Sequence, residues 1–268
     1  MVAGSGSQLR AAVRPAFGLL LCLGLLLAGC GGAAAPACGT EPCTRVLFLG
    51  NSYTYVNDLP STFARLATSG GRQVEVSSVA NGGETLAQHA AASDSLDAIS
   101  SRRWTYVILQ EQSETPATWA GRTSMYPAVR TLAGRIESAG ATPMLFMTWA
   151  HRDGLPTAGL ADYGAMQQQI DNAYLAIAQE LGVPVAPVGY TWSLVRQDHP
   201  EIGLWGDDGS HPSGAGTYLA ACVFYASIFR ASSVGLTYYG GVGADQARLL
   251  QDEAGRRVLD PKAQWGLR

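Results

Sequence analysis

The sequence predicts an α/β fold in which a mostly parallel sheet of five strands carries helices on both faces. Short apolar runs with β propensity alternate along the chain with longer segments of helical spacing. Glycine-rich turns separate these segments, and no internal repeat interrupts their order. Because alternation of this kind is typical of parallel strands joined by crossover helices, residues 45–268 are expected to form one domain with a single core.

The N-terminus has the composition of an export signal. Arg10 and Arg14 supply positive charge, residues 17–27 form an apolar core, and a Leu-Ala-Gly-Cys tetrapeptide ends at Cys30. The tetrapeptide resembles the lipobox of bacterial lipoproteins, so we expect residues 1–29 to be removed and Cys30 to be lipidated. A transmembrane anchor and an ordinary secretory signal are the alternatives, although the apolar run is shorter than the roughly 20 residues that span a bilayer.

Residues 30–44 are predicted to tether the domain to a membrane, since they are rich in glycine, alanine and proline. Cys38 and Cys43 lie in this tether and can close a disulfide in an oxidising envelope. Gly31 stands where an aspartate is associated with inner-membrane retention in some bacteria. The expected location is therefore the bacterial cell envelope, the outer membrane before the inner one, or otherwise secretion.

Charge and cysteine usage argue against two classes of partner. The whole chain has a net charge of −3, and the predicted signal segment removes two arginines and no acid. The remaining arginines are scattered, so no nucleic-acid partner is expected. Two tether cysteines without partner histidines argue against a metal site, and Cys222, in an apolar helical pattern, is predicted to be a core residue.

The first strand is predicted at residues 46–49, an apolar run that Gly50 and Asn51 break. Ser52 follows at once, so its hydroxyl is expected to point into the crevice where open α/β sheets bind ligands. The alternative is that Asn51 or Ser52 only caps the next helix, predicted at residues 59–69.

A second strand is predicted at residues 74–79, and a glycine turn at residues 80–86 then enters a helix. Glycine allows a ligand to come close to the backbone, and the first residues of a helix have free N–H groups. The turn can therefore present the backbone amide of Gly83 to an anion. The alternative is an ordinary helix start that Asn81 caps.

Polar side chains follow the third strand, predicted at residues 106–110. The run Gln-Glu-Gln-Ser-Glu occupies residues 110–114, either as part of a site at the carboxyl edge of the sheet or as a solvated loop. Later elements are helices at 126–139, 162–181 and 245–258 and strands at 142–149 and 183–188. His151, in the loop after the fourth strand, either lines the pocket or is solvated.

Asp208 and His211 lie on a glycine and serine turn before an apolar helix that runs to about residue 229. The turn can hold the carboxylate beside one imidazole nitrogen, although Pro212 is also typical of a helix start. A serine alcohol becomes a nucleophile when a histidine accepts its proton, and a carboxylate fixes the histidine tautomer. Ser52, His211 and Asp208 supply these three roles.

Three blocks together resemble the SGNH hydrolases, the broader group around the GDSL esterases. Residues 50–53 (Gly-Asn-Ser-Tyr) are similar to the first block, with asparagine where many members carry aspartate. Residues 82–85 are similar to the second block, and residues 208–212 (Asp-Gly-Ser-His-Pro) to the last. The blocks run across residues 45 to about 230, and their order and spacing are more specific than any single block.

The third block departs from the pattern of the family. It usually has glycine and then asparagine, whose side-chain amide completes the oxyanion hole, whereas residues 109–113 read Leu-Gln-Glu-Gln-Ser. A glutamine amide can donate the same hydrogen bond, and some sugar-acetyl esterase branches resemble this form. The resemblance therefore implies Gln110 first and Gln112 second as the side-chain donor, beside the backbone amides of Ser52 and Gly83.

The resemblance implies a three-layer flavodoxin-like fold and ester hydrolysis through an acyl-enzyme, without metal or cofactor. Small acyl groups on carbohydrate, acetyl first, are the expected substrates, because of the envelope location and the glutamine form of the third block. An acyltransferase with the same triad and a non-catalytic glycan-binding lipoprotein are the alternatives. Four tryptophans either form an aromatic platform for a sugar ring or belong to the core: Trp119, Trp149, Trp192 and Trp205.

Overall fold

The computed structural model describes residue 1, residue 38 and residues 42–267. Cys30, the predicted signal segment and most of the predicted tether therefore lie outside the described residues. Cys38 and Cys43 form a disulfide, with their Cα atoms 5.9 Å apart. Within the described ranges, no helix has both the length and the apolar character that crossing a membrane requires.

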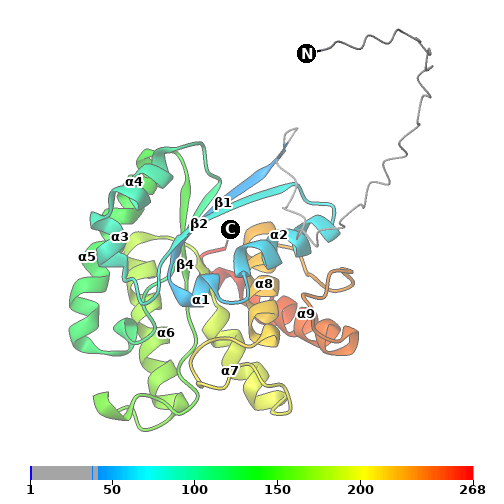
Figure 1. Cartoon of the computed structure of the whole chain (residues 1–268). Helices are drawn as coiled ribbons and strands as arrows, with labels where there is room; N and C mark the ends of the chain where they lie inside the picture. The colour runs from blue at the N-terminus through cyan, green and yellow to red at the C-terminus, as the bar shows by residue number, and fades with distance from the viewer. Residues whose placement is uncertain (2–37, 39–41, 268) are drawn as a thin grey trace. The chain divides into compact units, whose positions relative to one another are not determined.

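A parallel sheet of five strands lies at the centre of the domain, and this confirms the predicted fold class (Figure 1). The strands are β1 (Thr44–Gly50), β2 (Val74–Ala80), β3 (Tyr106–Leu109), β4 (Thr142–Phe146) and β5 (Val185–Ala186). Their order is β2-β1-β3-β4-β5, and every neighbouring pair is parallel. The chain therefore moves outward in opposite directions from β1 and β3, and the turns after these two strands border the crevice where such sheets bind ligands.

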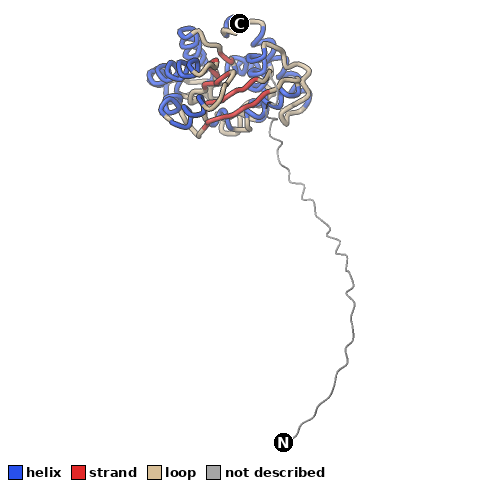
Figure 2. Tube along the Cα trace, turned by 90° about the horizontal axis from the view of Figure 1, so that it is seen from above, coloured by secondary structure: helices blue, strands red, loops and turns tan. Residues whose placement is uncertain are grey.

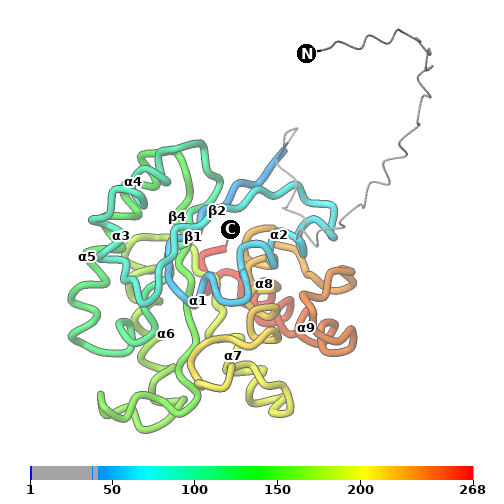
Figure 3. The backbone as a smooth tube through the Cα atoms, in the orientation of Figure 1, coloured from blue at the N-terminus to red at the C-terminus, as the bar shows by residue number. Residues whose placement is uncertain are grey.

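Helices cover both faces of the sheet and complete a three-layer α/β fold (Figure 2). One layer contains α2 (Leu59–Ser69), α7 (Val188–Asp198), α8 (Gly214–Phe229) and α9 (Ala244–Leu259). The other contains α3 (Leu86–Ala91), α4 (Ser93–Ser100), α5 (Trp119–Ser138) and α6 (Tyr163–Leu181). Figure 3 shows that α2 and α8 lie side by side although they are far apart in the sequence.

Shorter elements fill the connections. A single helical turn, α1 (Ser52–Tyr55), directly follows β1. Three 3₁₀ segments are η1 (Thr115–Ala117), η2 (Pro156–Ala158) and η3 (Lys262–Trp265).

Aromatic packing joins β1 to α2 and α8, which lie on the same face of the sheet. The Phe48 ring meets Phe63 of α2 at 6.3 Å and Phe224 of α8 at 5.4 Å, both edge to face. All three rings are fully buried, and truncating such a ring to alanine costs about 3–5 kcal/mol. Cys222 is buried in the same helix, α8, as its apolar surroundings predicted. The strand that leads to Ser52 therefore has a rigid support.

Several element boundaries differ from the prediction. The helix predicted at 126–139 begins at Trp119, because the Thr118 side chain caps it by accepting the N–H of Gly121. The strand predicted at 183–188 is only two residues long, since Pro187 ends it and is the N-cap of α7. Neither α7 nor α4 was predicted.

Candidate active site

The chain turns sharply after β1, and Ser52 lies on that turn as the first residue of α1. Asn51 caps α1, because its side-chain oxygen accepts the N–H of Tyr53 at 3.1 Å. The capping interpretation therefore holds for Asn51, and it leaves the Ser52 hydroxyl available. Among the described residues, no acceptor faces the backbone N–H of Ser52.

Three predicted residues come together in one hydrogen-bonded series. His211 Nε2 lies 2.9 Å from Ser52 Oγ, and His211 Nδ1 lies 2.5 Å from Asp208 Oδ2. The other carboxylate oxygen of Asp208 accepts the backbone N–H groups of Ser210 and His211, both at 2.9 Å. Asp208 therefore both orients the imidazole and fixes the loop that carries it.

The Asp208 carboxylate stays ionised over the whole neutral range. Its hydrogen bond with His211 and then the N–H of Ser210 lower the pKa of Asp208 to about 2. Because an ionised carboxylate only accepts hydrogen bonds, the Nδ1 atom of His211 must carry the proton. In the neutral imidazole Nε2 is then the acceptor, which is the form that can take a proton from Ser52.

An aromatic stack ties the histidine loop to the serine turn. The Tyr53 ring lies 4.5 Å from Trp149 at an interplanar angle of 7°, and Trp149 lies 4.2 Å from Trp192 at 8°. Two hydrogen bonds reach Ser210: the Tyr53 hydroxyl meets its Oγ at 2.8 Å, and Trp149 Nε1 donates to its carbonyl at 3.0 Å. The His211 and Tyr53 rings also pack edge to face, with centroids 5.8 Å apart.

The four tryptophans do not form one platform. Trp149 and Trp192 are fully buried, so the sugar-platform interpretation is wrong for them and the core interpretation is confirmed. Trp205 is partly buried and donates from Nε1 to the carbonyl of Ala150 at 3.1 Å. Trp119, at the start of α5, is 82% exposed.

Gln110 lies beneath the serine turn, with both sides of its amide occupied. Its Oε1 accepts the N–H of Asn51 at 2.8 Å and the hydroxyl of Thr54 at 2.9 Å. Its Nε2 donates to Asn51 Oδ1 at 2.9 Å and to the Glu111 carbonyl at 2.7 Å. Because both N–H groups are used inside the fold, the assignment of Gln110 to an oxyanion hole is corrected.

Gln110 has a supporting role instead, because its side-chain amide binds both the backbone N–H and the side-chain oxygen of Asn51. Gly50 makes this contact possible. A Cβ atom at that position would collide with Gln110 Oε1 and with the Thr54 hydroxyl.

Gln112, the second choice, keeps one N–H group uncommitted. Its Nε2 donates to Ser113 Oγ at 3.3 Å and has no other partner in the described part of the chain. Its Oε1 accepts the backbone N–H groups of Glu114 and Thr115, at 2.9 and 3.0 Å. The side chain is thereby oriented while a donor remains available.

Gly83 lies on the turn between β2 and α3 with a φ of +71°, which favours glycine. No acceptor within residues 42–267 faces its N–H group. The turn is joined to the serine turn, because Asn51 Nδ2 donates to the Glu84 carbonyl at 3.0 Å. Asn81 is not the cap of α3, since Thr85 has that role in a capping box with Gln88.

Two buried polar residues near the site were not assigned a role from the sequence. His89 contacts the Gly50 carbonyl through Nε2 at 2.9 Å and Ser95 Oγ through Nδ1 at 2.8 Å. Glu111 is fully buried directly after β3. The position of Glu111, a charged residue directly after an apolar strand, could have indicated a role in the site. His89 lies in an ordinary helical pattern, which contains no such indication.

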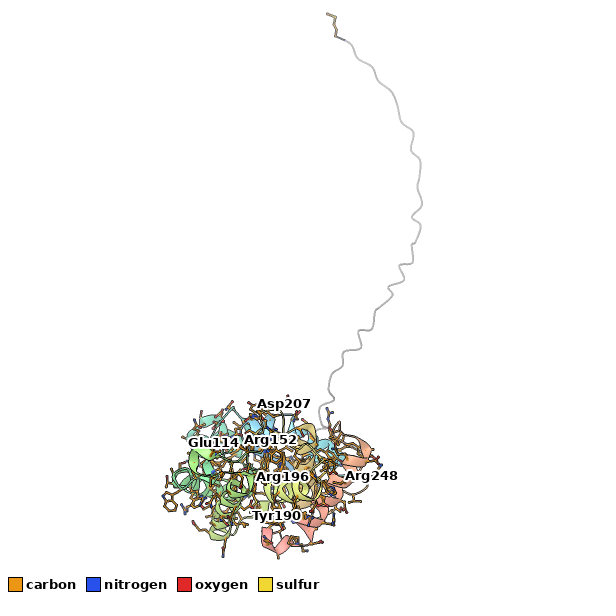
Figure 4. The ribbon with its side chains drawn as sticks, turned by 90° about the horizontal axis from the view of Figure 1, so that it is seen from below. Glu114, Arg152, Tyr190, Arg196, Asp207 and Arg248 are labelled. Carbon is orange, nitrogen blue, oxygen red and sulfur yellow. A yellow bond between two sulfur atoms is a disulfide. The ribbon has the colours of Figure 1, made fainter. Side chains whose placement is uncertain are left out.

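His151 lines the site and is not simply solvated. Its Nε2 lies 3.3 Å from Ser113 Oγ, and burial, as the largest cause, lowers its pKa. Figure 4 shows Glu114, Arg152 and Asp207 at the same edge of the molecule. In the described part of the chain, no group of three His, Cys, Asp or Glu side chains is placed to hold a metal ion.

Comparison with known proteins gives matches among solved structures. A protein from Slackia heliotrinireducens described as an SGNH hydrolase is 31% identical, with a TM-score of 0.60, and the match covers 69% of this chain and 99% of that chain. A DUF4886 family protein from Bacteroides uniformis is 18% identical, with a TM-score of 0.71 and coverages of 82% and 96%. An acetyl xylan esterase is 14% identical, with a TM-score of 0.57 and coverages of 69% and 99%. No protein-family model and no curated protein matches the sequence.

Proposed function

The chain belongs to the SGNH hydrolases and is an ester-hydrolysing enzyme, and we propose that it is a serine esterase whose catalytic residues are Ser52, His211 and Asp208. The observation that carries this proposal is the hydrogen-bonded series of these three residues, 2.9 Å from serine to imidazole and 2.5 Å from imidazole to carboxylate. The nucleophile, its base and the group that orients the base are thus in the geometry that nucleophilic catalysis requires.

The reaction proceeds in two halves. Ser52 Oγ bonds to the acyl carbon while its proton moves to His211 Nε2, and the carbonyl oxygen becomes an oxyanion. The C–O bond to the alcohol then breaks, and the alcohol leaves with the proton from Nε2. In the second half, water gives a proton to Nε2 and its oxygen attacks the acyl-enzyme. The acid is released, and Ser52 Oγ recovers the proton.

Three uncommitted donors are proposed to stabilise the oxyanion. They are the backbone N–H groups of Ser52 and Gly83 and the Nε2 of Gln112. Loss of one such donor typically raises the barrier by about 3–4 kcal/mol, so three donors account for a large share of catalysis. Gln112 replaces Gln110 in this role, because the amide of Gln110 is used to hold the serine turn.

The proposed substrates are small acyl esters, acetyl first, on a carbohydrate alcohol. Two observations support this class: acetyl xylan esterases occur among the structural neighbours, and the rim of the site is polar, with Ser113, His151 and Glu114.

We further propose that a lipid at Cys30 anchors the enzyme in the bacterial cell envelope, as the lipobox-like tetrapeptide predicts. Cys30→Ala should then abolish incorporation of a labelled fatty acid in cells. Unchanged labelling of this variant would contradict the anchor without affecting the esterase assignment.

An acyl-length series tests the proposed function. The soluble form that starts after Cys30 is expected to hydrolyse 4-nitrophenyl acetate at least tenfold faster than the octanoate, to release acetate from acetylated xylan, and to be labelled by a fluorophosphonate at Ser52. A faster rate with octanoate would contradict the substrate class alone. Absence of both turnover and labelling would contradict the serine esterase itself.

Tyr53→Phe removes the hydrogen bond between the stack and the histidine loop, together with the interaction of the same hydroxyl with Ser113. The ring still stacks on Trp149, but the 2.8 Å bond to Ser210 is lost. One hydrogen bond is worth about 1 kcal/mol, so kcat for 4-nitrophenyl acetate should fall about fivefold with KM unchanged. Tyr190→Phe, on α7 against Trp265, is the matched control and should retain the parent kcat. Equal rates in both variants would remove Tyr53 from the support of His211.

A further inference from the structure

Glu111 is a buried carboxylate without a described role. It follows Gln110 at the end of β3, and its side chain is fully buried. Its Oε1 accepts two backbone N–H groups, from Gln112 at 2.7 Å and from Leu86 at 3.1 Å. Its Oε2 is buried and has no hydrogen-bond partner in the part of the chain that the structure describes.

The two N–H groups belong to the two segments that carry oxyanion donors. Gln112 provides the side-chain donor, and Leu86 begins α3 directly after the turn that carries Gly83. These segments are 25 residues apart along the chain, from Leu86 to Glu111. One carboxylate oxygen therefore fixes the position of one segment relative to the other.

We propose that Glu111 is a positioning residue whose ionised carboxylate sets the geometry between the Gly83 and Gln112 donors of the oxyanion hole. The inference rests on the proposed function, because it needs an oxyanion to be stabilised. A misplacement of about 1 Å at such a donor can cost about 100-fold in rate, so a residue that touches no substrate can control turnover.

Among residues 42–267, no lysine, arginine or histidine forms an ion pair with Glu111. The titratable side chain that packs beside Glu111 is Tyr174 of α6, whose hydroxyl accepts the Glu111 backbone N–H at 3.1 Å. On α3, His89 faces the Gly50 carbonyl and Ser95 instead. Burial, as the largest cause, raises the pKa of Glu111 to about 7, and the N–H groups of Gln112 and Leu86 oppose this shift.

The direction of the pH effect follows from this pKa. Above about pH 7 the carboxylate is ionised, and its bonds to the N–H groups of Gln112 and Leu86 are charge-assisted. Below that pH the proton goes to Oε2, the oxygen without a partner, and the two bonds weaken. Activity should therefore fall on the acid side with an additional ionisation near pH 7, that of Glu111. A buried anion without a cation costs stability, so a purely structural role would be better filled by a neutral side chain.

Glu111→Gln tests the proposal, because glutamine keeps the shape and the accepting oxygen but removes the charge. For 4-nitrophenyl acetate we expect kcat to fall about 10–30-fold with KM within about threefold, and the additional ionisation near pH 7 to disappear. Gln112→Ala gives the reference for complete loss of that donor, about 100-fold. The double variant should be less than about tenfold slower than Gln112→Ala alone, because the part of the Glu111 effect that acts through Gln112 is already lost there.

A matched control separates positioning from stability. Glu253 is a buried carboxylate that pairs with Arg256 and Arg257 on α9, a helix that contributes no residue to the proposed site. Glu253→Gln should lower the melting temperature but leave kcat and its decrease at low pH unchanged. Glu111→Gln at pH 8 should instead have a melting temperature within a few degrees of that of the parent.

The same measurements distinguish a failure of the Glu111 inference from a failure of the proposed esterase function. Parent turnover equal to that of Ser52→Ala would overturn the esterase assignment. An active parent with Glu111→Gln matching it in kcat and in pH profile would overturn the positioning role alone. If Glu111→Gln does not fold, the pH profile of the parent enzyme is the test. A fall in kcat at low pH through a single ionisation contradicts the inference, and an additional ionisation near pH 7 supports it.

Discussion

Ser52→Ala is expected to lower kcat/KM for 4-nitrophenyl acetate by about 10⁵-fold or more, because the variant has no atom that can form the acyl-enzyme. The fold should be unaffected. The Ser52 hydroxyl has His211 as its side-chain partner and does not cap α1, which Asn51 caps. The measurement is steady-state hydrolysis beside circular dichroism and thermal melting.

Ser124→Ala is the control for this result. Its hydroxyl, on the exposed side of α5, donates to the Gly121 carbonyl at 2.8 Å and touches none of the proposed site residues, so activity should equal that of the parent. Substantial hydrolysis by Ser52→Ala would show that another group is the nucleophile. Loss of folding in that variant would instead assign Ser52 to the structure of the turn.

Asp208→Asn is expected to lower kcat by about 1,000-fold or more while the loop stays in place. The side-chain oxygen can still accept the N–H groups of Ser210 and His211. The new amide donates to His211 Nδ1, so the imidazole proton moves to Nε2 and the nitrogen facing Ser52 can no longer act as a base. The residual rate should exceed that of Ser52→Ala, because the nucleophile and the oxyanion donors remain.

The pH dependence gives a second readout for Asp208. Its pKa of about 2 keeps the carboxylate ionised from pH 5 to 9, so it should contribute no ionisation to the parent profile. Asp207→Asn, at the adjacent exposed position, is the control and should change kcat by less than about twofold. If the two variants behaved alike, Asp208 would not be the partner that orients His211.

Much of the fold could be predicted from the sequence, because the strands are short apolar runs or, for β2, an alternating run, bounded by turn residues. Residues 46–49 and 106–109 are such runs, and they pair in the parallel sheet. The missed elements lack that signal. The helix α7 begins inside a predicted strand, where Pro184 and Pro187 flank two strand residues, and α4 is a short segment rich in serine and aspartate.

The site was predictable in its residue types and less so in its side-chain hydrogen bonds. Ser52, Asp208 and His211 were identified because their chemistry and turn positions fit one mechanism. The choice between Gln110 and Gln112 depended on register: Leu49 pairs with Leu109, which places Gln110 beside Asn51 and uses its amide there. No pattern along the chain carries that information.

The separation of Ser52 and His211 in the chain has a consequence for when the enzyme becomes active. The serine, Gly83 and Gln112 all precede the base, which lies 159 residues after Ser52. At a synthesis rate of about 5–20 residues per second, roughly 8–30 s pass between the emergence of the nucleophile and that of its base. A nascent chain therefore carries an inert serine through most of its translation, and it becomes able to hydrolyse esters only when the last quarter of the protein, which carries Asp208 and His211, docks.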